Sequence, residues 1–219
     1  MKYLYGLLLS VVSLIGLVSC HKADNYYYNF KQEEQMFDAV IYDYLMQQPG
    51  IYDSLAIVLE RLPSLKSKLS DKNKHLTFFA ANNRSFSLAI ANLNNARRLR
   101  DLAPMYLSDI SVDILEVLMH RYVFDKPYKV ADFETYLDGR SLNSSKFDYE
   151  MHVFYMLLSS SGLEQGGRQQ LVFSDVNNSI YQRYWNSTTT ETVNFNTQNG
   201  VIHTLTARHE FAFGKLVSY

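Results

Sequence analysis

A single cysteine, Cys20, closes an apolar stretch at the start of this 219-residue chain. Because the chain has no second cysteine, it cannot form an intramolecular disulfide and must be stabilised by packing. The chain that remains after residue 19 is of ordinary length for one domain, and 47% of the full sequence is hydrophobic. The sequence therefore predicts one domain with a sizeable core and no covalent cross-links.

Residues 1–19 have the layout of a bacterial lipoprotein signal peptide. Lys2 gives a positive start, residues 4–17 are apolar, and the small residue Ser19 precedes Cys20. In such signals the cysteine thiol accepts a diacylglyceryl group, cleavage occurs before the cysteine, and the new amino group receives a fatty acid such as palmitate. Each buried methylene contributes about 0.8 kcal/mol, so several acyl chains on Cys20 would anchor the protein firmly.

Two alternatives for this segment are a membrane-spanning helix and an ordinary secretory signal with a chance cysteine. The apolar run is shorter than the roughly 20 residues that a span needs, which disfavours the first. No aspartate follows Cys20 as a retention signal, and residues 21–24 are a faint version of the charged export tags of Bacteroidetes lipoproteins. We therefore expect a lipid-anchored protein of the outer membrane, with cell-surface and periplasmic orientations both open.

Charge and composition indicate which classes of partner the chain can bind. Its 21 basic and 22 acidic residues nearly balance and are interspersed, which argues against nucleic acid as a partner. Tyrosine is abundant, with 17 residues, and amphipathic aromatic side chains suit binding surfaces.

The first half of the chain reads mainly as helices. Residues 20–35 are polar or tyrosine-rich without periodicity, which indicates a flexible tether. Apolar residues at helical spacing predict helices over 37–45 and 51–62. Later segments predict a buried strand over 76–80, a turn at 82–84, a helix from about Ser85, and a helix capped by Ser111 or Asp113.

The second half reads mainly as strands. Asp138-Gly139 is a hairpin turn signal, because glycine tolerates the positive φ that such turns require, and strands are expected on both sides. Further strands are predicted over 151–158, 171–173, 201–205 and 211–213. Helices first and strands afterwards are typical of an α+β fold.

Two motifs in this pattern resemble those of the fasciclin-like domain. The segment 77–86, TFFAANNRSF, resembles the family motif T-V-F-A-P-T-N-x-A-F, and 199–205, NGVIHTL, resembles N-G-V-I-H followed by a hydrophobic strand. Between them, 115–128 stands where the family has a helix running into a Tyr-His strand. The resemblance covers 36–219 and implies an α+β fold, a β-sandwich or wedge with packed helices, in a protein that adheres or binds rather than catalyses.

The chain departs from the family pattern at several positions. Ala81 and Asn82 replace Pro-Thr, Arg121-Tyr122 stand in place of Tyr-His, and Thr206 stands where aspartate is common. Because the aspartate and the Tyr-His pair are associated with adhesion in animal members, those roles are not carried over to this chain.

The motif residues themselves have structural interpretations. Phe78, Phe79 and Phe86 are expected in the core, because phenylalanine is usually buried. Asn82 and Asn83 can bond to nearby backbone and are expected to cap the next helix. His203 lies in an apolar strand, which favours a hydrogen-bonded structural histidine over a catalytic one.

The stretch 143–198 is longer than the family core needs, and we interpret it as an insertion. It contains Tyr181, Arg183, Tyr184 and Trp185, the only tryptophan. Aromatic rings beside polar side chains form sugar-binding platforms, because C–H faces stack on the rings while hydroxyls bond to the polar groups. The alternative is that these rings cover a small core within the insertion.

Signatures of catalysis are absent from the sequence. It lacks zinc-type, nucleophile-elbow, Walker and dinucleotide-binding motifs, so we expect no metal, no cofactor and no enzymatic activity. Lipidation would also remove Cys20 as a nucleophile. A pair of glycosidase carboxylates is the one catalytic arrangement left open; Asp132, Glu134 and Asp138 are the nearest cluster, with a solvated face as the alternative.

These observations predict a non-enzymatic, membrane-tethered lipoprotein that binds a glycan in a polysaccharide-uptake system or another envelope ligand. A structural subunit that binds another envelope protein is the second hypothesis. An undetected glycoside hydrolase is the third.

Overall fold

The computed structural model describes residues 35–159 and 167–219. The predicted signal peptide, Cys20 and all of the tether except Gln35 lie outside the described residues. Within these two ranges, no helix is both long enough and apolar enough to cross a membrane.

Three short helices come first: α2 (Ile41–Met46), α3 (Asp53–Glu60) and α4 (Pro63–Ser70). The helices predicted over 37–45 and 51–62 are confirmed as α2 and α3, although α2 begins four residues later than expected. Helix α4 was not predicted. It begins at Pro63, a position where the missing backbone N–H would have no partner within the helix.

Two further helices are α5 (Asn83–Arg98) and α6 (Val112–Met119). Of the caps predicted for them, Asn82 rather than Asn83 and Ser111 rather than Asp113 hold the helix starts. The Asn82 side-chain oxygen accepts a hydrogen bond from the backbone N–H of Ser85 at 3.1 Å. The Ser111 hydroxyl accepts one from the N–H of Ile114 at 3.4 Å. Both caps satisfy a donor at a helix start that no intrahelical carbonyl can reach.

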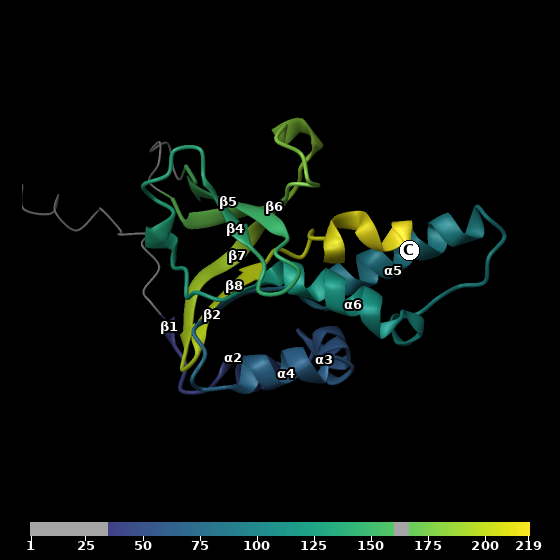
Figure 1. The fold of residues 1–219 in the computed structure, drawn as a ribbon, viewed down its shortest axis with the longest axis horizontal. Coiled ribbons are helices and arrows are strands. Elements are labelled where there is room, and N and C mark those ends of the chain that lie inside the picture. The colour runs from purple at the N-terminus through teal and green to yellow at the C-terminus, as the bar shows by residue number, and fades with distance from the viewer. Residues whose placement is uncertain (1–34, 160–166) are drawn as a thin grey trace, which may run out of the picture. The chain divides into compact units, whose positions relative to one another are not determined.

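In the described part of the chain, eight strands form one continuous sheet in the order β3-β2-β8-β7-β6-β5-β4, with β1 beside β7 (Figure 1). The strands are β1 (Gln35–Met36), β2 (Leu76–Ala80), β3 (Val123–Phe124), β4 (Arg140–Asn143), β5 (Glu150–Leu157), β6 (Gln169–Asp175), β7 (Asn186–Thr197) and β8 (Gly200–Leu205). Strand β2 is parallel to β8 and β1 to β7, and the other pairs are antiparallel. Short 3₁₀ helices are η1 (Leu107–Asp109), η2 (His120–Tyr122), η3 (Val130–Asp132), η4 (Gln182–Tyr184) and η5 (Phe211–Ser218).

Strand β7 joins the two halves of this sheet. Its first residues, 186–189, pair with β6, whereas 190–197 pair with β8. The register with β8 is irregular after Thr190 and again after Thr192, and irregularities of this kind bend a strand. The stretch assigned to an insertion, 143–198, thus supplies β5, β6 and β7, which are hydrogen-bonded into the same sheet as the motif strands.

Aromatic side chains fill the core between the sheet and the helices. The rings of Phe79 in β2 and Phe173 in β6 are stacked with centroids 4.1 Å apart. Phe86 in α5 stacks on Phe211 at 4.4 Å. Phe78, Phe79 and Phe86 are at most 2% exposed, which confirms their interpretation as core residues.

Asn199 and Gly200 of the second motif have structural roles at the turn before β8. The fully buried Asn199 side chain accepts a hydrogen bond from Ile41 N–H at 2.8 Å and donates to the carbonyl oxygens of Leu69 and Asp71. It therefore holds the start of α2 and the end of α4 at the sheet. A Cβ atom on Gly200 would lie 2.2 Å from the Leu76 carbonyl oxygen, so only glycine fits there.

Two strand predictions are wrong. Asp138-Gly139 forms a turn that leads into β4, but the residues directly before the turn, 133–137, are not a strand. Instead, the Gly139 N–H bonds to the nearby Tyr136 carbonyl. The predicted strand over 211–213 is the start of η5, with positive φ at Ala212 and Phe213. The Ala212 N–H bonds to a side chain rather than to a neighbouring strand.

Candidate ligand-binding pocket

A pocket of about 480 Å³ lies on the face of β5, β6 and β7 that points away from the aromatic core. Residues alternate between the two faces of a strand, and Met151 and Val153 of β5 are fully buried in the core. The next residues along, His152 and Phe154, line the pocket instead. The rest of the floor comes from Val172, Ser174 and Ser187.

The walls of the pocket come from two loops. Leu137 and Asp138, in the turn before β4, form one wall, and Gln182 and Trp185 form the other. We call this cavity the Trp185 pocket. It combines two aromatic residues with a carboxylate, an imidazole, an amide and two hydroxyls.

His152 connects the floor to one wall. Burial lowers its pKa below the ordinary 6.5, against the opposing effects of a hydrogen bond to the Asp138 backbone and of nearby carboxylates. The imidazole is therefore neutral at pH 7. Beside it, the hydroxyls of Ser174 and Ser187 are hydrogen-bonded to each other at 2.8 Å.

The Trp185 indole is held in place on two sides. Its ring centroid lies 4.7 Å from that of His152, and its Nε1–H donates to the Ser179 carbonyl oxygen at 2.7 Å. Since the indole N–H is already paired, the side chain offers the pocket mainly apolar ring surface.

The segment 176–185 stands out from the ends of β6 and β7 (Figure 1). It carries all four residues that the sequence singled out as a platform. Trp185 lines the pocket, whereas Tyr181 and Tyr184 are 57% and 54% exposed beside it. The Arg183 guanidinium lies 5.3 Å and 4.8 Å from their ring centroids. The structure therefore places one of the four in the pocket and gathers the other three into an exposed cluster.

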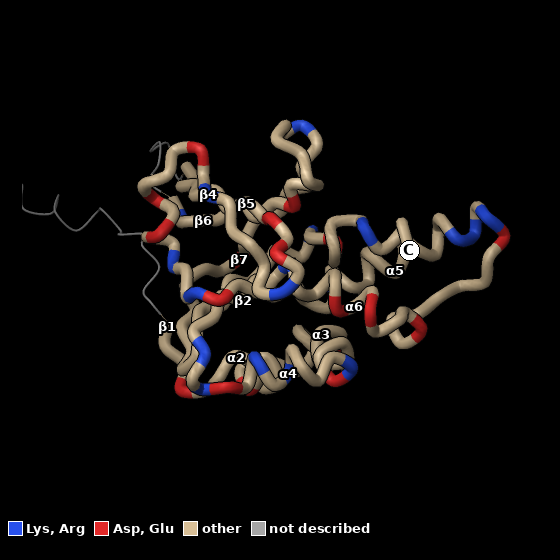
Figure 2. The backbone as a smooth tube through the Cα atoms, viewed as in Figure 1, with Lys and Arg blue, Asp and Glu red and all other residues tan. Residues whose placement is uncertain are grey.

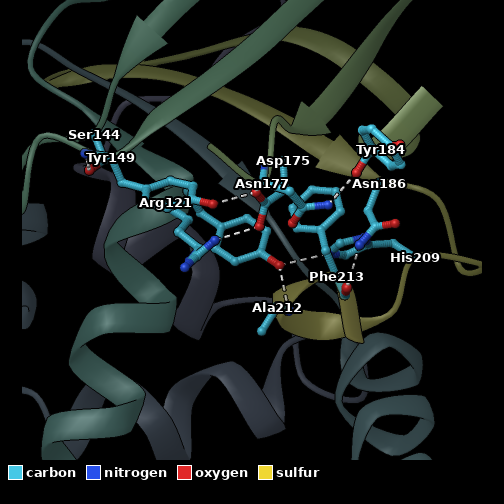
Figure 3. A network of polar contacts seen from close by, with 11 residues as sticks. Arg121, Ser144, Tyr149, Asp175, Asn177, Tyr184, Asn186, His209, Ala212 and Phe213 are labelled. Atoms are coloured by element: carbon cyan, nitrogen blue, oxygen red, sulfur yellow. Dashed lines mark hydrogen bonds and ion pairs between the residues drawn. The ribbon is translucent and has the colours of Figure 1, made fainter. Parts of the chain in front are cut away.

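A buried ion pair fixes the base of this segment (Figure 3). Arg121 in η2 pairs with Asp175 at the end of β6, and their side chains are 8% and 0% exposed. The Tyr149 ring lies 3.7 Å from the guanidinium, and its hydroxyl donates to Asp175 at 2.6 Å. Asp175 also accepts from Asn177 N–H at 2.8 Å, and the Asn177 amide donates to the Tyr184 carbonyl.

Tyr122, beside Arg121, makes a second internal connection. Burial lowers the pKa of His209 to about 3, so the imidazole is neutral. Its Nε2 accepts a hydrogen bond from the Tyr122 hydroxyl at 2.9 Å. The same hydroxyl accepts the Ala212 N–H at 2.7 Å. Arg121 and Tyr122, which depart from the family pattern, are thus buried and serve the packing of this chain.

The interpretation of His203 as a structural histidine is confirmed. The side chain is fully buried, and burial lowers its pKa to about 4. Its Nε2–H donates to the Tyr128 carbonyl at 2.9 Å, while Nδ1 accepts the Asn194 N–H at 3.3 Å.

A second pocket of about 300 Å³ adjoins the first, and Trp185 and Ser187 line both. Its other lining residues include Arg208 and Glu210, and burial raises the pKa of the Glu210 carboxyl. Trp185 therefore contributes to both pockets.

The three carboxylates that the sequence analysis considered as a cluster make separate contacts in the structure. Asp132 accepts a hydrogen bond from Lys129 N–H at 2.7 Å, and Glu134 accepts one from the Gln169 amide at 2.9 Å. Among the described lining residues of the Trp185 pocket, Asp138 is the one carboxylate. No group of three His, Cys, Asp or Glu side chains suited to a metal ion occurs in residues 35–159 and 167–219.

The architecture has a counterpart among solved structures. It is similar to a FAS1 domain pair from the insect cell adhesion molecule fasciclin I, with a TM-score of 0.51 and 13% sequence identity over 76% of this chain. The fold is fasciclin-like. This chain covers 49% of the length of that domain pair. No family model matches the sequence, and no curated protein matches it.

The fasciclin-like fold was expected from the two motifs, but most of the pocket was not. No motif contains His152, Phe154 or Ser174, and they come together only through the pairing of β5 with β6. The available signal was the two-residue period of a strand, which puts His152 and Phe154 on one face of β5 and Val172 and Ser174 on one face of β6.

Proposed function

We propose that this protein is a non-enzymatic binding module that holds a glycan in the Trp185 pocket. The observation that carries the proposal is the composition of the pocket, in which the rings of Trp185 and Phe154 lie among the polar side chains of His152, Gln182 and Asp138. Sugar rings present apolar C–H faces and polar hydroxyls, and they fit sites that offer both kinds of surface.

The adjoining pocket supports a ligand of more than one sugar unit. Because Trp185 lines both pockets, one ring can stack on the indole while the next reaches Arg208 or Asn186. The absence of catalytic motifs from the sequence supports binding rather than hydrolysis.

We further propose that a lipid on Cys20 anchors this module to the outer membrane, exposed at the cell surface in a polysaccharide-uptake system of the Bacteroidetes type. The support is the sequence of the first 20 residues. Labelling of growing cells with an alkyne-tagged fatty acid should mark the wild-type protein and not the Cys20→Ser variant. Equal labelling of both would contradict the anchor, and protease treatment of intact cells would test the surface orientation.

Calorimetry against a panel of oligosaccharides tests the pocket. The experiment uses the chain from residue 20 onward with the substitution Cys20→Ser, which retains every described residue of the core. We expect Trp185→Ala to weaken the binding of a positive glycan about tenfold or more, as for the loss of one aromatic stacking partner. Phe147→Ala removes an aromatic ring that is 52% exposed and does not line the pocket, so it is the matched control.

Binding that Trp185→Ala leaves unchanged would place the glycan elsewhere. A panel with no binding at all would favour the second candidate, a subunit that binds another envelope protein. The observation for that candidate is the exposed cluster of Tyr181 and Tyr184 beside Ile180, which is 86% exposed. If the protein is such a subunit, Ile180→Asp should abolish recovery of the partner protein from native membranes, whereas Trp185→Ala should not.

A further inference from the structure

The loop that follows α5 is the most exposed apolar and basic part of the described chain outside the segment 176–185. Residues 98–104 are all exposed, and Leu99 and Leu102 are 83% and 49% exposed. We call residues 97–106 the α5 tip. In Figure 1 it extends beyond the other elements, at the end opposite β1.

Three basic residues lie close to these leucines in the sequence. Arg97, Arg98 and Arg100 lie in the α5 tip with a single acidic residue, Asp101, so the local charge is +2 (3 − 1) in a chain whose overall charge is −1. Figure 2 shows this concentration of blue at the end of α5. Within the described residues, Arg98 and Arg100 form no ion pair, so their charges are available to an external partner.

The α5 tip is held in a defined shape by its own hydrogen bonds. The Arg97 guanidinium Nε–H donates to the Ala103 carbonyl oxygen at 2.7 Å. The Asn94 side chain bonds to both the N–H and the carbonyl of Met105, at 2.8 Å and 2.9 Å. Because the backbone is fixed, the leucines are exposed without a packing partner in the described structure, and little order has to be gained on binding.

We propose that the α5 tip inserts into the surface of a bilayer that contains anionic lipids. Exposed leucines bury their side chains among the acyl chains, and neighbouring arginines bind headgroup phosphates. Tyr106, which is 63% exposed, is suited to the interface because its ring is apolar and its hydroxyl polar. A projecting loop with two exposed leucines and a net positive charge fits this partner better than a protein surface, which requires a broad complementary face.

This contact is independent of Cys20 and of the Trp185 pocket, and sedimentation with vesicles tests it in the Cys20→Ser chain that begins at residue 20. Vesicles of phosphatidylcholine with about one third phosphatidylglycerol should bind the protein, and pure phosphatidylcholine should bind it more weakly. Each basic residue near an anionic surface contributes on the order of 1 kcal/mol, so Arg98→Glu with Arg100→Glu should reduce binding at least about tenfold. Leu99→Ser with Leu102→Ser should reduce it on the same vesicles.

Matched controls are available on the same chain. Lys72→Glu with Lys74→Glu makes the same change in charge at exposed positions in the loop between α4 and β2, and Ile57→Ser removes an exposed apolar side chain of α3. Both controls should bind as the wild type does. The proposal is overturned if the wild type does not bind anionic vesicles, or if the α5-tip variants bind as strongly as the controls. Because all substituted residues are exposed, circular dichroism should show that every variant is folded.

Discussion

Arg121 and Asp175, 54 residues apart in the chain, form a buried ion pair that joins η2 to the end of β6. Asp175 directly precedes the segment 176–185, which carries Trp185, and it accepts a hydrogen bond from the Asn177 N–H at the start of that segment. The stability of the domain and the position of the proposed binding wall therefore depend on the same two charges.

Removing one member of this pair should be strongly destabilising. Arg121→Met leaves the Asp175 carboxylate buried without its cation, and such changes lower the free energy of unfolding by about 3–5 kcal/mol. Urea denaturation followed by circular dichroism measures the effect. The double variant Arg121→Met with Asp175→Leu should recover part of the loss, because no buried charge remains, while the Tyr149 hydroxyl and the Asn177 N–H lose their acceptor.

The exposed pair of Lys146 and Glu116 is the control for this prediction. Lys146→Ala should change the free energy of unfolding by less than about 1 kcal/mol, because solvent screens an exposed pair. Equal effects of Arg121→Met and Lys146→Ala would show that Asp175 is not dependent on its partner.

Gly139 should be indispensable for the shape of the Trp185 pocket. Its φ is +78°, and a Cβ would lie 2.4 Å from Cε1 of His152 and 2.6 Å from the Val153 carbonyl oxygen. Gly50 has a similar φ of +80° but open space around it, so Gly50→Ala isolates the backbone effect, about 1–2 kcal/mol. Urea denaturation should show a larger loss for Gly139→Ala, and a crystal structure should show His152 displaced. Equal losses of stability in the two variants would mean that His152 and Val153 make room for the added Cβ without strain.

Asn199 should contribute to stability through its hydrogen bonds rather than through ligand contact. Asn199→Ala leaves the buried N–H of Ile41 and the carbonyl of Leu69 without their side-chain partner, which should lower the free energy of unfolding by about 2 kcal/mol or more. Asn73→Ala, at an exposed position, should have little effect. Thermal unfolding compares the two variants, and similar melting temperatures would contradict the role assigned to Asn199.

The buried histidines should make the domain sensitive to acid. An unfolded histidine titrates near pH 6.5, whereas burial lowers the pKa of His203 to about 4 and that of His209 to about 3. Between pH 6.5 and these values the unfolded state binds more protons, so the free energy of unfolding falls as the pH falls. Urea denaturation from pH 7 to pH 5 should show this loss.

A single substitution tests which histidine is responsible. Gln at position 209 can still accept the Tyr122 hydroxyl proton but does not titrate, so His209→Gln should make the loss of stability between pH 7 and pH 5 smaller. The matched variant His75→Gln changes an exposed histidine and should leave the pH dependence as it is. A pH dependence unchanged by His209→Gln would assign the effect to other groups.

Local sequence predicted the elements whose formation depends on short-range interactions. The buried strand 76–80 and the core positions of Phe78 and Phe79 follow from periodicity and hydrophobicity and are confirmed. Capping chemistry predicted where α5 and α6 begin, and the structure selected Asn82 and Ser111 from the two candidates at each helix. The fasciclin-like fold was reached through two short motifs, in which residues such as Asn199 and Gly200 make contacts that hold the helices and strands of this chain together.

The tertiary structure decided what depends on partners distant in the chain. The sequence did not indicate that 186–197 forms one long strand, since its pairing with β6 and β8 supplies the hydrogen bonds that stabilise it. It predicted a strand at 211–213, where the Tyr122 hydroxyl instead binds Ala212 and allows a left-handed turn. The sequence alone singled out Cys20 and Trp185 by their chemistry. Only the folded chain brought His152 and Asp138 to Trp185, because a pocket is formed by strand pairing and loop packing rather than by neighbours in sequence.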